Sequence, residues 1–181
     1  VSDGTLSDTQ AISVKVNDVA ETASGSGSWS TSGSGTSTIV VSNATELMTA
    51  LKSATGGETI SLKSGDYGSL QLIDQKNFFA QYASQVTITA ADPGHPASFA
   101  GIDFRGVDNI KFDGVTFDYN AAPGAYLFVA PVMISSGTGI TIINSTFAGD
   151  VATGVDAAAD GYGTGVALKV AQSSGIVIEN V

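Results

Sequence analysis

Three related segments near the C-terminus decide the fold: D-N-I-K-F-D-G-V-T-F-D (108–118), T-G-I-T-I-I-N-S-T-F-A (138–148) and S-G-I-V-I-E-N-V (174–181). Aligned, they place Ile110, Ile140 and Ile176 in one column, at offsets of 30 residues (140 − 110) and 36 residues (176 − 140). Self-similarity at such periods is typical of repeat proteins, in which neighbouring repeats bury one another. We therefore expect these isoleucines to lie on top of one another in space.

Each repeat is predicted to contain three short strands. Further apolar columns accompany the isoleucines at constant spacing. They are Ile102, Val132 and Leu168, then Phe104, Ile134 and Val170, then Phe112, Ile142 and Ile178. Alternation along these segments indicates half-buried strands.

One column predicts a sharp bend between two strands. It holds Gly114, Asn144 and Asn180, and Gly and Asn are the residues that tolerate left-handed backbone. Phe117 and Phe147 follow at the same spacing and begin the third strand. Three strands and a fixed bend describe a coil of roughly triangular section, in which strands of one column pair in parallel.

A helix is predicted before the repeats, over residues 43–55. Asn43 and Glu46 have the spacing of a capping box, with Asn43 as the N-cap. An apolar stripe follows at helical spacing, formed by Leu47, Met48, Leu51 and Ala54, and Gly56-Gly57 ends the helix. Because an open end would expose the core, we expect this helix to cover the first coil.

The chain divides into three segments: 1–21, 22–38 and 39–181. Residues 1–21 end in V-K-V-N-D-V-A-E (14–21) and resemble the tail of a cadherin-like or immunoglobulin-like repeat. Residues 22–38 are almost entirely Ser, Gly and Thr, which predicts a flexible linker. Residues 39–181 carry the predicted fold.

Residues 39–181 resemble the N-terminal part of the pectate-lyase-like superfamily. The segments that carry the resemblance are A-T-E-L-M-T-A-L-K-S-A (44–54), G-G-E-T-I-S-L-K-S-G-D-Y (56–67) and V-T-I-T-A-A-D-P-G-H-P-A (86–97). The resemblance implies an all-β fold, a right-handed parallel β-helix of which only the N-terminal coils are present, with an N-terminal capping α-helix.

The resemblance also implies a function. It points to a fragment of a secreted, extracellular bacterial protein that acts on polysaccharide, of the lyase or mannuronan epimerase type, and we expect the fragment alone to be inactive. Two alternatives stay open: a non-catalytic adhesin or matrix module that binds glycans, and a glycoside hydrolase of the same fold. Whether the parent protein is an enzyme, and its oligomeric state, are open at this point.

Composition excludes several partners. The chain has 7 Lys and Arg against 17 Asp and Glu, a net charge of −10. Nucleic acid and anionic lipid are disfavoured because few cations are available to meet phosphate. The longest apolar stretch, near residues 125–134, is too short to cross a bilayer, so we expect no membrane insertion.

Two long connections are the candidate binding loops for a glycan. They cover residues 119–131 and 149–167, and they are expected to leave the same corner of successive coils. Aromatic rings stack on sugar faces, and carboxylates accept hydrogen bonds from sugar hydroxyls. The predicted glycan-binding residues are Tyr119, Tyr126, Asp150, Asp156, Asp160 and Tyr162.

Asp150, Asp156 and Asp160 are also a candidate calcium site. Carboxylates with nearby carbonyl groups suit a hard cation. Their spacing matches no EF-hand loop, so the alternative is that they solvate a surface loop.

The basic residues and the single histidine favour no catalytic assignment. His95 lies between Gly94 and Pro96, which indicates a turn. Arg105 and Lys111 are predicted to point outward, because Phe104 and Phe112 point inward. No column of basic residues forms, so both are interpreted as exposed charges.

Overall fold

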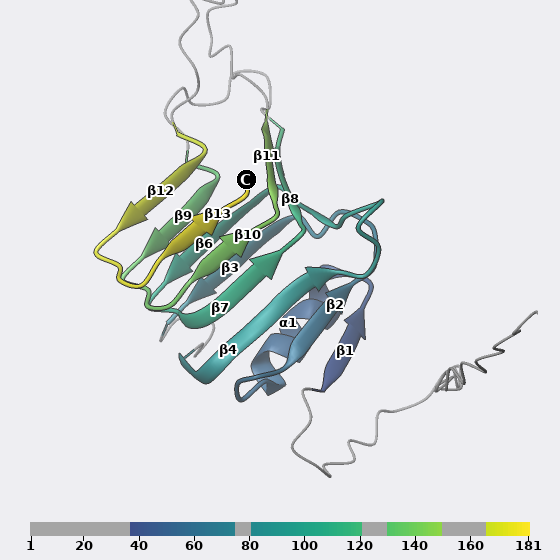
Figure 1. The fold of residues 1–181 in the computed structure, drawn as a ribbon, viewed down its shortest axis with the longest axis horizontal. Helices are drawn as coiled ribbons and strands as arrows, with labels where there is room; N and C mark the ends of the chain where they lie inside the picture. Colours follow the sequence, from purple (N-terminus) through teal and green to yellow (C-terminus); the bar gives the residue numbers. More distant parts are fainter. Residues whose placement is uncertain (1–36, 75–80, 121–129, 150–165) are drawn as a thin grey trace, which may run out of the picture. The chain divides into compact units, whose positions relative to one another are not determined.

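The structure is a computed structural model that describes residues 37–74, 81–120, 130–149 and 166–181. The described residues are mostly β, with one helix (Figure 1). The elements are β1 (Thr38–Val41), α1 (Ala44–Ser53), β2 (Thr59–Leu62), β3 (Ser69–Ile73), β4 (Gln81–Ala90), β5 (Ser98–Phe99), β6 (Gly101–Arg105), β7 (Asp108–Asp113), β8 (Thr116–Tyr119), β9 (Val132–Ser135), β10 (Thr141–Ile143), β11 (Thr146–Gly149), β12 (Leu168–Ala171) and β13 (Val177–Glu179).

The described strands form three sheets in which neighbouring strands run parallel. The six-stranded sheet has the order β1-β2-β4-β7-β10-β13, the three-stranded sheet β11-β8-β5, and the four-stranded sheet β12-β9-β6-β3. From β6 onward the chain visits the four-, six- and three-stranded sheets in turn, so neighbours in a sheet are one repeat apart in sequence (Figure 1). The expected all-β class is confirmed.

The predicted columns are confirmed by the strand register. Phe112 pairs with Ile142, and Ile142 with Ile178. The column of Ile102, Val132 and Leu168 is in register across the four-stranded sheet. β3, β4 and β5 extend the same three sheets and therefore form an earlier repeat. The sequence alignment missed this repeat.

The corners between sheets are built from left-handed residues. The predicted bend column is confirmed, with φ of 72°, 50° and 58° at Gly114, Asn144 and Asn180. Two further columns were not predicted: Gly106, Ser136 and Gln172 follow β6, β9 and β12, and Asn109, Gly139 and Gly175 lie near the starts of β7, β10 and β13. These columns connect the four-stranded sheet to the six-stranded one.

Inward side chains of all three sheets share one core. Phe112 of the six-stranded sheet lies 5.8 Å from Phe104 of the four-stranded sheet, centroid to centroid. It also lies 5.7 Å from Phe99 and 5.5 Å from Phe117, both of the three-stranded sheet. All four rings are buried, and aromatic pairs at such distances add to the stabilisation from burial.

The predicted helix is α1, and it packs on this core. Leu47, Ala50 and Leu51 are buried, while Met48 and Ala54 are partly buried against the same cluster. The N-cap is confirmed, because the Asn43 side chain accepts a hydrogen bond from Glu46 N at 3.0 Å.

The capping box is wrong in one detail. The Glu46 carboxylate accepts from Ser42 N and Ser42 Oγ, both at 2.8 Å, so it reaches one residue beyond the N-cap. Either arrangement satisfies a backbone N–H group that the helix leaves free.

Stacking of repeats can be tested within one column. We expect Ile142→Ala to lower the free energy of unfolding by about 2–5 kcal/mol, because Ile142 is fully buried. The matched control, Ile178→Ala, removes the same atoms from a side chain that is 36% exposed, and we expect a loss of about 1 kcal/mol. Urea unfolding measures both, and equal losses would contradict the stacking order.

Candidate functional site

A groove of about 390 Å³ lies on the outward face of the four-stranded sheet. We call it the Tyr119 groove. Its floor comes from β3, β6 and β9, and its wall comes from the end of β8 and the residues just before β9. Its lining includes the side chains of Gln71, Asp103, Met133, Tyr119 and Asn120.

Strand alternation places the floor residues in one file. Leu72 and Phe104 point into the core, so their neighbours Gln71 and Asp103 point outward. Gln71 is in register with Asp103, and Asp103 with Met133. Adjacent strands lie about 4.8 Å apart. The file therefore exposes one outward side chain about every 4.8 Å across the sheet.

Gly101 allows the wall to approach the floor. A Cβ atom at this position would lie 2.5 Å from the carbonyl oxygen of Pro131. That oxygen accepts a hydrogen bond from Ile102 N at 2.8 Å. Any larger residue would push Pro131 away, so glycine at 101 fixes the distance between floor and wall.

The charged group in the groove is Asp103, and Arg105 holds it. Arg105 Nε donates to Asp103 Oδ1 at 2.9 Å, and Nη2 donates to Oδ2 at 2.7 Å. The Asp103 side chain is 19% exposed and that of Arg105 is 51% exposed. Hydrogen bonding to the carboxylate raises the pKa of Arg105. This two-pronged pair fixes the carboxylate orientation.

Of the predicted glycan-binding residues, Tyr119 alone falls within the described part of the chain. It is the last residue of β8, not the first of a loop, and it lines the groove beside Asp103 and Met133. The other five, Tyr126, Asp150, Asp156, Asp160 and Tyr162, lie outside the described residues. Calcium binding by the three aspartates therefore stays a prediction; the described ranges contain no acidic or histidine cluster suited to a metal ion.

Sequence reasoning missed Gln71, Asp103 and Met133. Each occupies an outward position on a strand, and nothing in its local sequence distinguishes it from other outward positions. The available signal was the register, since Asp103 and Met133 lie one residue after the aligned Ile102 and Val132.

The remaining polar candidates behave as surface charges. Arg105 and Lys111 each pair with an aspartate two residues away on the same strand, Lys111 Nζ lying 2.9 Å from Asp113 Oδ2. His95 is 78% exposed and contacts Asp92 at 2.9 Å within a turn. The outward orientation of both cations and the turn at His95 are confirmed.

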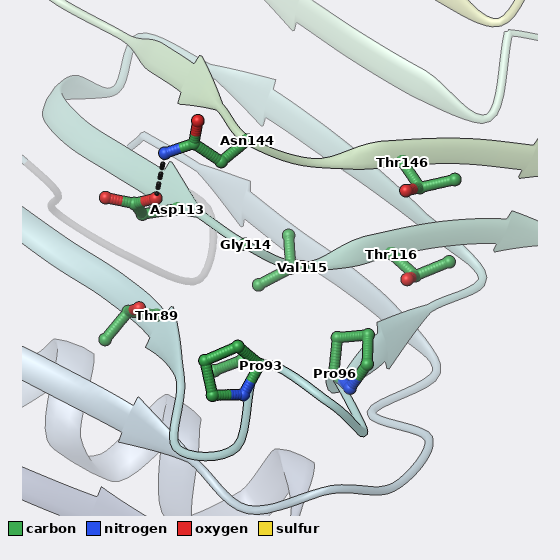
Figure 2. A pocket seen from close by; sticks show the side chains of 10 residues that line it. Thr89, Pro93, Pro96, Asp113, Gly114, Val115, Thr116, Asn144 and Thr146 are labelled. Carbon is green, nitrogen blue, oxygen red and sulfur yellow. Dashed lines mark hydrogen bonds between the residues drawn. The ribbon is translucent and has the colours of Figure 1, made fainter. Parts of the chain in front are cut away.

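A second hollow, of about 380 Å³, lies at the corner between the six- and three-stranded sheets (Figure 2). Two of its lining side chains, Asp113 and Asn144, are hydrogen-bonded to each other. Asn144 Nδ2 donates to Asp113 Oδ1 at 2.8 Å, and Asn180 Nδ2 donates to Asn144 Oδ1 at 2.9 Å. We call this series of hydrogen bonds, from Asn180 through Asn144 to Asp113, the corner ladder. It joins successive repeats.

The corner ladder also sets the titration of Asp113. Burial alone would raise its pKa, but hydrogen bonds from Asn144 and Lys111 and the charge of Lys111 outweigh burial and lower it. A carboxyl group whose pKa is lower folded than unfolded stabilises the protein above its unfolded pKa. That stabilisation is lost as the pH falls through the folded pKa.

Comparisons with known proteins assign no family. No family model matches the sequence, and no curated protein matches it. No helix in the described ranges is long and apolar enough to span a membrane.

The corner ladder predicts a pH-dependent difference between two variants. Asn144→Gly keeps the left-handed backbone but removes one donor to Asp113, so the pKa of the native carboxyl group is lowered less and the ionised form loses part of its stabilisation. We expect this variant to be less stable than wild type at pH 7, with a gap that narrows below about pH 4. Urea unfolding across this range measures the gap.

Asn180→Gly is the matched control. It breaks only the link to Asn144, which joins two neutral amides, so its gap to wild type should stay constant with pH. A gap for Asn144→Gly that widens in acid would contradict the assignment.

Proposed function

We propose that the three parallel sheets are the faces of a right-handed parallel β-helix that binds a glycan chain along the Tyr119 groove. The regular rotation of the chain from four- to six- to three-stranded sheet supports the helix. Connections between parallel strands are almost always right-handed, which supports the hand. The observation that carries the function is the groove, in which Tyr119 stands beside a file of outward polar side chains.

The groove offers the groups that sugar recognition needs. Tyr119 is half-buried and lines the groove, and a tyrosine ring is a group that stacks on apolar sugar faces. Gln71 and Asn120 are amides, each with donors and an acceptor, and Asp103 supplies carboxylate acceptors. Met133 adds a polarisable apolar surface. Few charges, several hydrogen-bonding groups and an apolar surface at Met133 suit a polyhydroxylated ligand.

The file of floor residues suits a polymer more than a single sugar. Gln71, Asp103 and Met133 recur on successive strands, and Lys169 continues the file on β12. A ligand with a repeating unit meets one side chain after another along this direction. The parent protein is accordingly proposed to be a secreted polysaccharide-active protein, with the lyase or epimerase type still a prediction.

The described groove residues favour glycan binding over hydrolysis of a glycosidic bond. Among the described groove residues Asp103 is the single carboxylate, and both its oxygens accept from Arg105. Hydrolysis of a glycosidic bond by the usual route needs two carboxyl groups. The described groove therefore supports glycan binding, the property shared by the enzymatic and the adhesin alternatives.

Tyr119 provides the test of this function. We expect the chain to bind immobilised polysaccharide, and Tyr119→Ala to weaken binding by about tenfold or more, equivalent to about 1.4 kcal/mol. Tyr119→Phe keeps the ring and should stay within about threefold of wild type. Affinity electrophoresis in gels that contain candidate polysaccharides measures the three proteins together.

Circular dichroism serves as the control for folding of both variants. Binding that is unaffected by Tyr119→Ala would place the glycan elsewhere. Retention by no polysaccharide at all would refute glycan binding.

A further inference from the structure

We infer that the Tyr119 groove selects a neutral glycan, one without carboxylate or sulfate groups, and that the Asp103–Arg105 pair is the specificity determinant. The inference rests on the proposed glycan binding and names its substrate class. It departs from the polyuronates that the sequence resemblance implies.

First, the described groove has one charged lining residue, Asp103. The ionised group is its carboxylate, and the Asp103 side chain is 19% exposed. Arg105 balances that charge but spends two donors on it. A ligand carboxylate placed beside Asp103 would meet a like charge at short range, which is unfavourable in a partly desolvated site.

The second step is the composition of the connections that lead into β9 and β12. Residues 120–131 contain no charged side chain, and residues 150–167 contain three aspartates and no Lys or Arg. Neither connection therefore contains a cation that could pair with an anionic ligand. An anionic polymer would therefore find no counter-charge in either connection.

The third step is the hydrogen-bonding capacity that Asp103 retains. A carboxylate has about four lone-pair sites, and Arg105 occupies two of them. The remaining two accept hydrogen bonds, and sugar hydroxyls are donors of suitable geometry. Because Arg105 prevents rotation of the carboxylate, these acceptors are pre-organised, which lowers the entropic cost of binding.

Lys169 is the one feature that favours an anion. It continues the file of Gln71, Asp103 and Met133 on β12, one strand beyond Met133. A single cation two strands from Asp103 offers at most one ion pair, exposed and screened by salt. It provides the internal test of the inference, because a uronate ligand would depend on it.

The experiment compares the affinities of the full 181-residue chain for two sets of hexasaccharides. The neutral set contains mannohexaose, cellohexaose, xylohexaose and maltohexaose, and the acidic set contains the hexamers of mannuronate, guluronate and galacturonate. Calorimetry should show at least one neutral hexamer binding about tenfold more tightly than every acidic one. That binding should change by less than about twofold between low salt and about 0.5 M NaCl.

Asp103→Asn reverses the selectivity in this scheme. It removes a negative charge and releases the Arg105 guanidinium, so neutral-hexamer binding should fall about tenfold and acidic-hexamer binding should rise. The matched control is Glu179→Gln, the same change of charge on an exposed residue of the six-stranded sheet, which should leave both affinities unchanged. Thermal unfolding verifies that the variants fold.

These measurements distinguish failure of the neutral-glycan selectivity from failure of glycan binding itself. Tighter binding of an acidic hexamer, lost in Lys169→Ala but not in the control Lys52→Ala, would overturn the neutral-glycan inference and leave glycan binding intact. Neutral selectivity that persists in Asp103→Asn would overturn the role of Asp103. Binding of neither set would refute the proposed function itself.

Discussion

The structure depends on parallel pairing of each strand with the strand one repeat further along the chain. The pairing keeps equivalent side chains in register, so inward columns such as Phe112, Ile142 and Ile178 run through the core. No single repeat can bury its own apolar face; the neighbouring repeats do so. Burial falls along this column, since Phe112 and Ile142 are buried and Ile178 is 36% exposed at the last described strand.

Register inside the core dictates order on the outside. A strand whose inward residues are fixed has its outward residues fixed as well, because side chains alternate between the two faces. The file of Gln71, Asp103 and Met133 is thus a consequence of the packing of Leu72, Phe104 and Ile134. The same rule stacks Asn144 and Asn180 at a corner, where their amides form the corner ladder. The groove and the ladder are both external expressions of one internal constraint.

The sequence predicted those parts of the fold in which spacing is regular. Ile110, Ile140 and Ile176 recur with the same flanking pattern. The column of Gly114, Asn144 and Asn180 revealed one corner, because Gly and Asn tolerate left-handed backbone. The earlier repeat was missed because its pairs are unevenly spaced: Leu70 pairs with Ile102, 32 residues on (102 − 70), whereas Val86 pairs with Ile110, 24 residues on (110 − 86). Insertions at the corners shift the period without changing the register.

Local irregularity explains other misses. Between Gln81 and Val86 the register of β4 against β7 shifts, and in the same stretch the Tyr82 hydroxyl donates to the carbonyl oxygen of Leu51 at 2.8 Å. A contact between β4 and α1 joins residues 31 positions apart, so no local pattern encodes it. The corner at Ser136 and Gln172 is similar, because neither residue type favours a positive φ, and the fold imposes it.

The candidate site was predicted less completely than the fold. Tyr119 was identified from its aromatic character, but Asp103 is an ordinary outward residue until the register places it beside Tyr119. The ion-pair partner of Asp103, Arg105, could be recognised only from strand geometry, because residues two apart on a strand share a face. Chemistry that depends on neighbours from different strands is visible in the sequence only once the strand register is known.

The same two-residue rule accounts for the surface charge of the sheets. Three cations lie on described strands: Arg105, Lys111 and Lys169. The first two have an aspartate two residues away and pair with it, whereas the residue two positions after Lys169 is Ala171. The charges of Arg105 and Lys111 are therefore neutralised within their own strands. Lys169 is the exception, and its position at the end of the floor file makes it the residue at which a change of charge preference would arise.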